Sequence, residues 1–182
     1  MASAFSHIAI PVCLAIGLKI PKIPKSLIFL GMVLSILPDI DVIAFKFGIA
    51  YSSQWGHRGF THSIVFCAIF SAFLMPLSSY FKTSKCVVFG FSFISLFSHA
   101  ILDAFTNGGL GVALLWPFEH ARYFAPVAPI EVSPIGIRNF FTARGLEVIK
   151  SELFYIWLPC LSLGLLARFT SKRFISKPPS AS

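Results

Sequence analysis

Long apolar runs alternate with short polar breaks along this chain, and the pattern predicts an all-α membrane protein. Five hydrophobic segments are evident, at about residues 4–18, 26–37, 62–81, 86–105 and 153–169. At about 1.5 Å of rise per residue, the third and fourth are long enough to cross a hydrocarbon core of about 30 Å. The first two are shorter, and Pro38 is expected to end the second. Pro76 is expected to kink the third. We therefore expect a polytopic helical bundle.

The segments predict a single integral-membrane domain over residues 1–170, followed by a basic, disordered tail over 171–182. Between the fourth and fifth segments lies a connector, residues 106–152, that is rich in glycine, proline and aromatic side chains. We expect it to be irregular, with one short helix near its end at "GLEVIKSEL". Connectors of this length often carry function.

Composition supports the membrane assignment. The chain is 56% hydrophobic and only 12% charged, about half the charge of an ordinary soluble domain. Cys13, Cys67, Cys86 and Cys160 lie in or beside apolar runs without metal-binding spacing, so we interpret them as small buried hydrophobes.

The net charge of +8 is a signal of topology more than of nucleic-acid binding. Positive residues without acids cluster in two loops and the tail: Lys19, Lys22, Lys25, Lys82, Lys85, Arg168, Lys172, Arg173 and Lys177. The positive-inside rule predicts that these regions and the C-terminus are cytoplasmic. Residues 38–61 and 106–152 then face the other side of the membrane, and no nucleic-acid partner is expected.

That topology brings histidines and aspartates from four segments to the non-cytoplasmic face. His99 and Asp103 are four residues apart and would share one face of a helix. Imidazole and carboxylate ligands suit Zn²⁺ best here, with Mn²⁺ or Fe²⁺ as alternatives. One or two ions are expected, with these candidate ligands: His7, Asp39, Asp41, His57, His62, His99 and Asp103.

Further polar residues suggest catalytic roles. Asp41 could accept a proton from water, and Arg58 and Arg122 could hold phosphate oxygens. Simpler interpretations also stand at this point: His7 as an interfacial polar residue, Asp39 as a turn residue, and Arg58 as a head-group anchor.

Four motifs then carry a resemblance to a known family. "LPDID" (37–41), "HRGFTHS" (57–63), "SHAILD" (98–103) and "LLWPF" (114–118) resemble the YdjM-like family, from His7 to the last apolar segment. That family is described as LexA-regulated, membrane-bound, metal-dependent hydrolases, so the resemblance implies a metal-dependent hydrolase of undefined substrate.

The order of ligands is also similar, more distantly, to the zinc-dependent phospholipase C and single-strand nuclease superfamily. Those soluble enzymes use an N-terminal tryptophan as a ligand, which this chain lacks. Their second His/Glu pair has no clear match here; His120 with Glu131, or Glu152, could fill that role.

We therefore expect a hydrolase of a phosphoester or phospholipid head group at the non-cytoplasmic interface, with membrane lipids as partners. The oligomeric state is left open. Three alternatives are a membrane protein with a structural or regulatory metal, a metal-ion transporter, and a serine hydrolase using Ser63 or Ser98.

Overall fold

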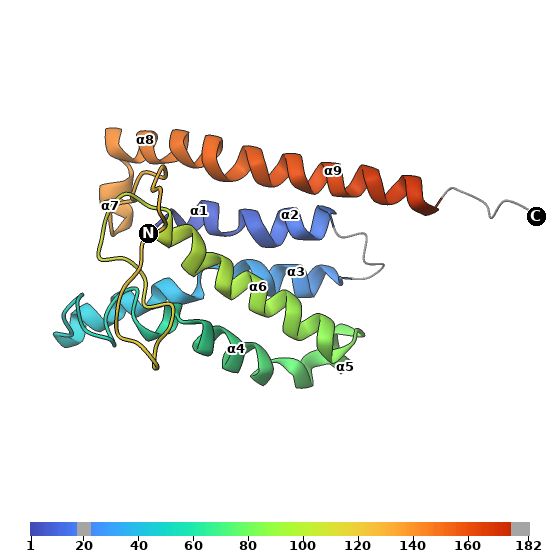
Figure 1. Cartoon of the computed structure of the whole chain (residues 1–182), viewed down its shortest axis with the longest axis horizontal. Helices are drawn as coiled ribbons and strands as arrows, with labels where there is room; N and C mark the ends of the chain where they lie inside the picture. The colour runs from blue at the N-terminus through green and yellow to red at the C-terminus, as the bar shows by residue number, and fades with distance from the viewer. Residues whose placement is uncertain (18–22, 176–182) are drawn as a thin grey trace, which may run out of the picture.

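The protein is a bundle of helices whose long axes run in roughly the same direction (Figure 1). A computed structural model describes residues 1–17 and 23–175, and in these ranges it contains helices and two isolated β-bridges but no strand. Four helical stretches are long and apolar enough to cross a membrane, and a shorter apolar one covers Ala4–Gly17. The predicted all-α membrane bundle is confirmed.

The first two apolar segments form helical stretches of unequal length. Helices α1 (Ala4–His7) and α2 (Ala9–Gly17) make the short N-terminal stretch. Helix α3 (Lys25–Leu34) is followed by η1 (Leu37–Phe47), a 3-10 helix. Helix α3 ends at Leu34, shortly before the break expected at Pro38, and this proline lies in the first turn of the new helix η1, where its missing N–H is not needed. The combined stretch Lys25–Phe47 is 23 residues long.

The third and fourth segments lie where the apolar pattern placed them. A 3-10 turn, η2 (Phe60–His62), leads into α4 (Ile64–Phe73). Pro76 lies in η3 (Met75–Leu77), which separates α4 from α5 (Ser78–Phe81), as expected for a kink. Helix α6 (Lys85–Ala104) crosses the bundle without interruption.

After an irregular stretch, the chain returns to helix over the last span. Helix α7 (Ile137–Phe140) is short, and α8 (Ala143–Glu152) matches the helix predicted near "GLEVIKSEL". A π-helical turn, η4 (Leu153–Trp157), joins α8 to α9 (Leu158–Ile175). Helix α9 thus continues past the predicted domain end at residue 170; residues 176–182 of the expected tail lie outside the described residues.

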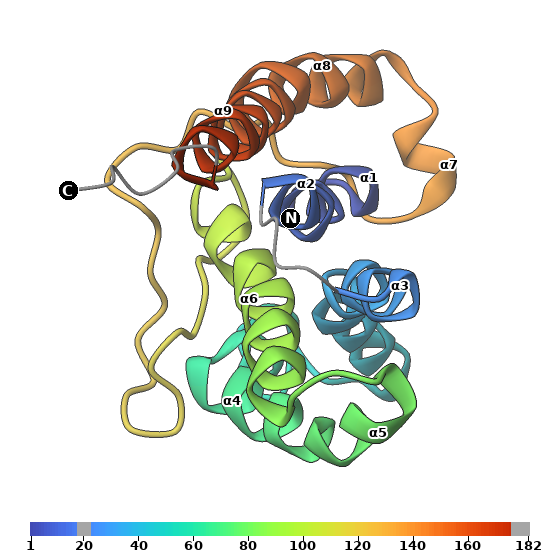
Figure 2. The ribbon, with the colours of Figure 1, turned by 90° about the vertical axis from the view of Figure 1, so that its right-hand side faces the viewer.

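The core packs α3, α4 and α6 together, while α2 packs against α9 on the other side (Figure 2). Leu27, Leu34, Cys67, Phe91 and Leu96 belong to the buried cluster of the first group. The buried state of Cys13 and Cys67 agrees with their predicted role, whereas Cys86 is exposed.

The two ends of the bundle differ in chemistry. The start of α1, the end of α3 with η1, the start of α4 and the end of α6 meet at one end (Figure 1). Lys25, Lys82, Lys85 and Arg168 belong to the opposite ends of their helices. Lys19, Lys22 and Lys177, which the topology prediction also used, lie outside the described residues.

Candidate metal centre

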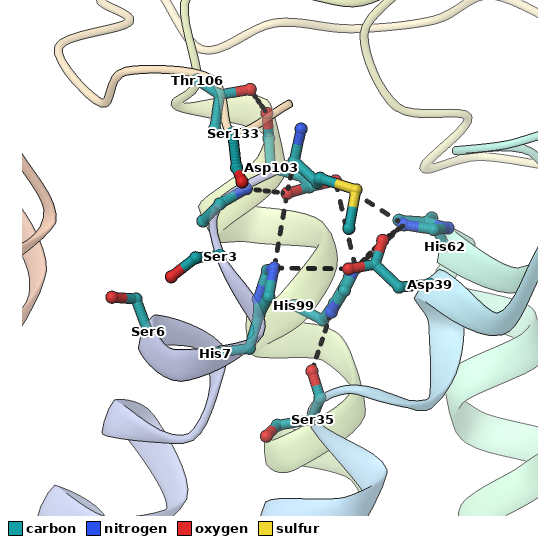
Figure 3. A network of polar contacts seen from close by, with 12 residues as sticks. Ser3, Ser6, His7, Ser35, Asp39, His62, His99, Asp103, Thr106 and Ser133 are labelled. Carbon is teal, nitrogen blue, oxygen red and sulfur yellow. Dashed lines mark hydrogen bonds and ion pairs between the residues drawn. The ribbon is translucent and has the colours of Figure 1, made fainter. Parts of the chain in front are cut away.

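Four of the predicted ligands converge in the interior at one end of the bundle. Asp39 comes from η1, His62 from η2, and His99 and Asp103 from the last turns of α6 (Figure 3). Each offers an atom within 4.8 Å of the others. None of the four side chains is more than 7% exposed. Three separate stretches of chain thus deliver nitrogen and oxygen ligands to one buried point.

The separations between these atoms, 3.0 to 4.0 Å, bracket the edges of a metal coordination shell. His62 Nε2 and His99 Nε2 lie 3.0 Å apart, and His99 Nε2 lies 3.3 Å from Asp39 Oδ1. Asp103 Oδ2 is 3.7 Å from His62 Nε2 and 3.9 Å from His99 Nε2. Ligands about 2.0–2.2 Å from a tetrahedral ion would lie roughly 3.3–3.6 Å from one another. The residues therefore fit a divalent ion of this size.

The partners of the two imidazoles assign their tautomers. His99 Nδ1 lies 2.7 Å from the carbonyl oxygen of Ser35, which can only accept, so His99 Nδ1 carries the proton. Thr61 donates its hydroxyl to Asp41 Oδ2 at 2.7 Å and accepts from His62 Nδ1 at 3.0 Å. Both Nε2 atoms are thus left as lone pairs facing each other. With both imidazoles neutral this arrangement is repulsive, and a cation held by both nitrogens would relieve it.

Burial reinforces the neutral state of His62, which precedes the span beginning at Ile64. Removal from water lowers the pKa of this imidazole, and contact with Asp41 opposes that shift only partly. A neutral imidazole is the form that binds metals.

His7 faces the same two carboxylates from the opposite side. Its ring stacks on His99 with centroids 3.7 Å apart. His7 Nε2 lies 3.6 Å from Asp103 Oδ1 and 3.9 Å from Asp39 Oδ2, the oxygens that do not face His62. Neither nitrogen of His7 and neither oxygen of Asp39 has a hydrogen-bond partner, although all four atoms are buried. Buried polar atoms are seldom left unpaired, so this group also has the chemistry of an ion site.

Asp41 lies beside the cluster and orients its members. Its Oδ1 lies 2.6 Å from His57 Nδ1, and its Oδ2 lies 3.3 Å from His62 Nδ1. The backbone N–H of Arg58 also donates to Oδ2. Asp41, His57 and His62 could form a second ligand group by proximity, but the atoms that face one another are already hydrogen-bonded. Asp41 is thus placed to orient His57 and His62, while its predicted roles as a ligand and as a proton acceptor stay predictions.

The "GHRG" turn folds back so tightly that it directs Arg58 inward. A Cβ on Gly56 or Gly59 would lie 2.2 Å or 2.1 Å from a backbone oxygen, so both positions require glycine. Arg58 has φ +62, a left-handed conformation that is uncommon for a residue with a side chain. The turn thus places a fully buried guanidinium against the metal centre.

The side-chain nitrogens of Arg58 all contact other groups of the protein. Nε lies 2.9 Å from Asp103 Oδ2, while the terminal nitrogens donate to the Gly108 carbonyl and to Thr106 Oγ1. The guanidinium is therefore used to hold Asp103 and the start of the connector. Its binding of substrate phosphate, and the alternative of an anchor at the head-group layer, stay predictions.

Arg122 is engaged in a similar way. Its terminal nitrogens donate to the backbone oxygens of His57, Tyr51 and Ser53, at 2.9, 3.1 and 2.8 Å. Burial lowers the pKa of this guanidinium, and Tyr51 opposes the shift. Arg122 therefore fastens the connector to the loop that carries His57, and its predicted phosphate-binding role stays a prediction.

Other candidates from the sequence lie away from the cluster. His120 is exposed, and Glu131 pairs with Arg144 at 2.6 Å. Ser63 caps α4 by accepting from the Phe66 N–H, and Ser98 donates to the Ser95 carbonyl. Neither hydroxyl is hydrogen-bonded to a histidine that could activate it as a nucleophile. Glu152 is fully buried but contacts Ser3 and Ser6. The second His/Glu pair is thus not assembled, and the serine-hydrolase alternative lacks its geometry.

A surface groove of about 300 Å³ adjoins two of the ligand-bearing segments. Leu37, Ile40 and Ala44 line it from η1, and Trp55, Phe60 and Phe66 line it from the other side. Asp41 and Thr61, which hydrogen-bond to each other, lie at its wall. The groove is mostly apolar.

Fold and centre together define a class: polytopic membrane proteins with a buried His/Asp cluster that can hold a metal. Comparison then gives the family. Residues 1–175 match the model of the YdjM inner membrane protein family. The chain is also 43% identical over 173 residues to inner membrane protein YbcI of Escherichia coli (strain K12), covering 91% of this chain and 97% of that protein. No solved structure matches significantly. The chain belongs to the YdjM family, and the resemblance seen in its motifs is confirmed.

Proposed function

We propose that this protein is a membrane-embedded, metal-dependent hydrolase that acts on a phosphoester, most simply a phospholipid head group, at the non-cytoplasmic interface. The observation that carries the proposal is the convergence of buried lone pairs. His62 Nε2, His99 Nε2 and an Asp39 oxygen lie 3.0–4.0 Å apart, and the tautomers leave no proton between the imidazoles. A buried group of this kind is stabilised by a divalent cation.

The carboxylates suit a pair of ions as well as one. Asp39 Oδ1 and Asp103 Oδ2 face His62 and His99, while Asp39 Oδ2 and Asp103 Oδ1 face His7. Each carboxylate could therefore offer one oxygen to each of two ions. Three residues, His7, Asp39 and Asp103, would leave coordination positions open on the second ion, as catalytic sites require.

When bound, divalent ions would supply Lewis acidity, which activates water and neutralises charge on a phosphoryl group. Other residues of the chain orient the candidate ligands for this chemistry. Ser35 and Thr61 hold the Nδ1 protons of His99 and His62, and Asp41 fixes the orientation of His62. Arg58 balances part of the negative charge of Asp103. Zn²⁺ suits the two-histidine, two-carboxylate set best, and Mn²⁺ or Fe²⁺ are alternatives.

The position of the centre supports a substrate drawn from the membrane. The ligands lie at the ends of apolar spans, and the neighbouring groove is apolar. Exposed aromatic side chains continue beyond the spans: Trp55 is 56% exposed and Phe118 86% exposed. Aromatic residues of this kind are typical of the membrane interface. Because basic residues belong to the opposite helix ends, the positive-inside rule favours a non-cytoplasmic location for the centre.

Two alternatives make different use of the same centre. A purely structural metal is favoured by the burial of all four ligands, because closed tetrahedral sites stabilise folds without turnover. A transporter is less favoured. Among the described residues, the buried polar side chains farther along the spans are serines, such as Ser71, Ser92 and Ser95, and none is charged.

A substrate screen separates these alternatives. Detergent-purified protein should be offered phospholipid mixed micelles and soluble phosphodiesters, with and without chelator, beside the His99→Ala variant. Chelator-sensitive cleavage that is lost in the variant is expected. Retained metal with no cleavage of any phosphoester would overturn the hydrolase proposal and leave the structural metal.

A further inference from the structure

Glu152 is a buried carboxylate that joins the last span to the first helical stretch. It lies at the end of α8 and is fully buried. Its carboxylate accepts from the Ser3 backbone N–H, from Ser3 Oγ at 2.6 Å and from Ser6 Oγ at 2.8 Å. Three donors compensate the buried charge, as a buried carboxylate requires. These contacts link residues that are almost 150 positions apart in sequence.

The π-helical turn directly after Glu152 adds a second contact to the same serine. Trp157 Nε1 donates to Ser6 Oγ at 3.1 Å. Residues five apart point in different directions on an α-helix, with 3.6 residues per turn, but are neighbours across a turn of π-helix. The turn Leu153–Trp157 therefore brings Glu152 and Trp157 to one side, where both reach Ser6.

The residue after Ser6 is His7, which has no anchor of its own. Neither of its nitrogens has a hydrogen-bond partner, unlike His62 and His99, whose Nδ1 atoms are held by Thr61 and Ser35. The direction of the His7 ring is set by its stacking on His99 and by its backbone. That backbone lies where Glu152 holds the Ser3–Ser6 segment.

We propose that Glu152 is a positioning residue for an ion at His7, Asp39 and Asp103. It contacts none of these three residues and acts by fixing the N-terminal segment so that His7 Nε2 faces Asp39 Oδ2 and Asp103 Oδ1. This inference rests on the two-ion form of the proposed function, but not on the identity of the substrate. Trp157 supports the same serine from the far end of the π-helical turn.

A metal titration tests the proposal. Chelator-stripped, detergent-purified protein is titrated with Zn²⁺, and with Co²⁺ to record the visible spectrum of each site. Wild type should bind two equivalents. Glu152→Gln places an amide donor against the donors of Ser3 and Ser6. The affinity for the second equivalent of metal should therefore fall at least tenfold, while the affinity for the first is unchanged. Trp157→Phe, which removes the indole N–H but keeps an aromatic ring, should lower the affinity for the second equivalent less.

Glu147→Gln is the matched control, because it makes the same change on the same helix at an exposed residue paired with Arg144. It should bind both ions as wild type does. Hydrogen exchange of residues 3–7 in the metal-free protein gives a readout that is independent of metal, and Glu152→Gln should exchange faster there.

The outcomes are distinct. One bound equivalent in wild type, or two equivalents of unchanged affinity in Glu152→Gln, would overturn the inference. An equal loss of affinity for both equivalents would also overturn it, because the substitution would then have destabilised the protein in general. If wild type binds two ions and cleaves no phosphoester, the hydrolase proposal fails and the role of Glu152 stands.

Discussion

Arg58 Nε lies 2.9 Å from Asp103 Oδ2, and both side chains are fully buried. The pair joins the "GHRG" turn to the end of α6, so one contact fixes two parts of the metal centre. It also explains why a positive side chain follows His57 in a largely apolar chain. The guanidinium balances the charge of this buried carboxylate on its Oδ2 side, while the N-terminal ammonium lies 4.0 Å from Oδ1.

Removing this guanidinium should destabilise the protein strongly. Arg58→Met keeps much of the volume but leaves Asp103 Oδ2 without its cationic partner, and breaking a buried pair costs about 3–5 kcal/mol. Denaturant unfolding in detergent, with metal removed, measures the loss. Arg144→Met is the control, since Arg144 and Glu131 are 40% and 35% exposed and their pair should contribute about 0–1 kcal/mol. Equal effects of the two changes would contradict the role assigned to Arg58.

Metal content should depend on the buried histidines and not on histidine in general. Purified wild type is expected to carry one to two equivalents of transition metal by elemental analysis. His62→Ala and His99→Ala should each lose most of it, because each removes a nitrogen from the group in which the two Nε2 atoms lie 3.0 Å apart. His120→Ala, an exposed position, should retain wild-type content. Metal-free wild type would refute the centre itself.

The sequence was informative where chemistry follows helical spacing. His99 and Asp103 share a face of α6 because they are four residues apart, and the apolar pattern located α6 to within a residue at each end. Asp39 and His62 were identified because ionisable residues beside apolar spans are costly unless they have a use. Family resemblance in the motifs agreed with this.

Sequence reasoning could not foresee contacts that backbone carbonyls decide. The guanidinium of Arg122 donates to main-chain oxygens of Tyr51, Ser53 and His57, and that of Arg58 donates to the Gly108 carbonyl beside its contacts with Asp103 and Thr106. Every residue has a carbonyl, so no pattern of side chains reveals which ones will face an arginine. The role of Glu152 was hidden for a related reason, because its donors come from the other end of the chain.

Asp41 should tune the metal without binding it. Asp41→Asn keeps the shape of the side chain but weakens its acceptance from His57, His62 and Thr61, so a loss of about 10–100-fold in metal affinity is expected. Competition with a calibrated chelator measures this affinity. Stoichiometry should be unchanged at saturating metal. A reduced number of bound ions at saturation would instead make Asp41 a ligand.

The orientation of the centre can be tested with single cysteines in a variant whose four native cysteines are replaced by serine. Glu119→Cys lies in the connector and Lys82→Cys in the turn before α6, and both positions are exposed. Lys82 lies with the basic helix ends, which the positive-inside rule assigns to the cytoplasm. A membrane-impermeant maleimide should therefore label position 119 once the outer membrane is opened, and position 82 only after the inner membrane is disrupted. The opposite labelling pattern would place the metal centre on the cytoplasmic side, so a substrate would have to be sought in the inner leaflet.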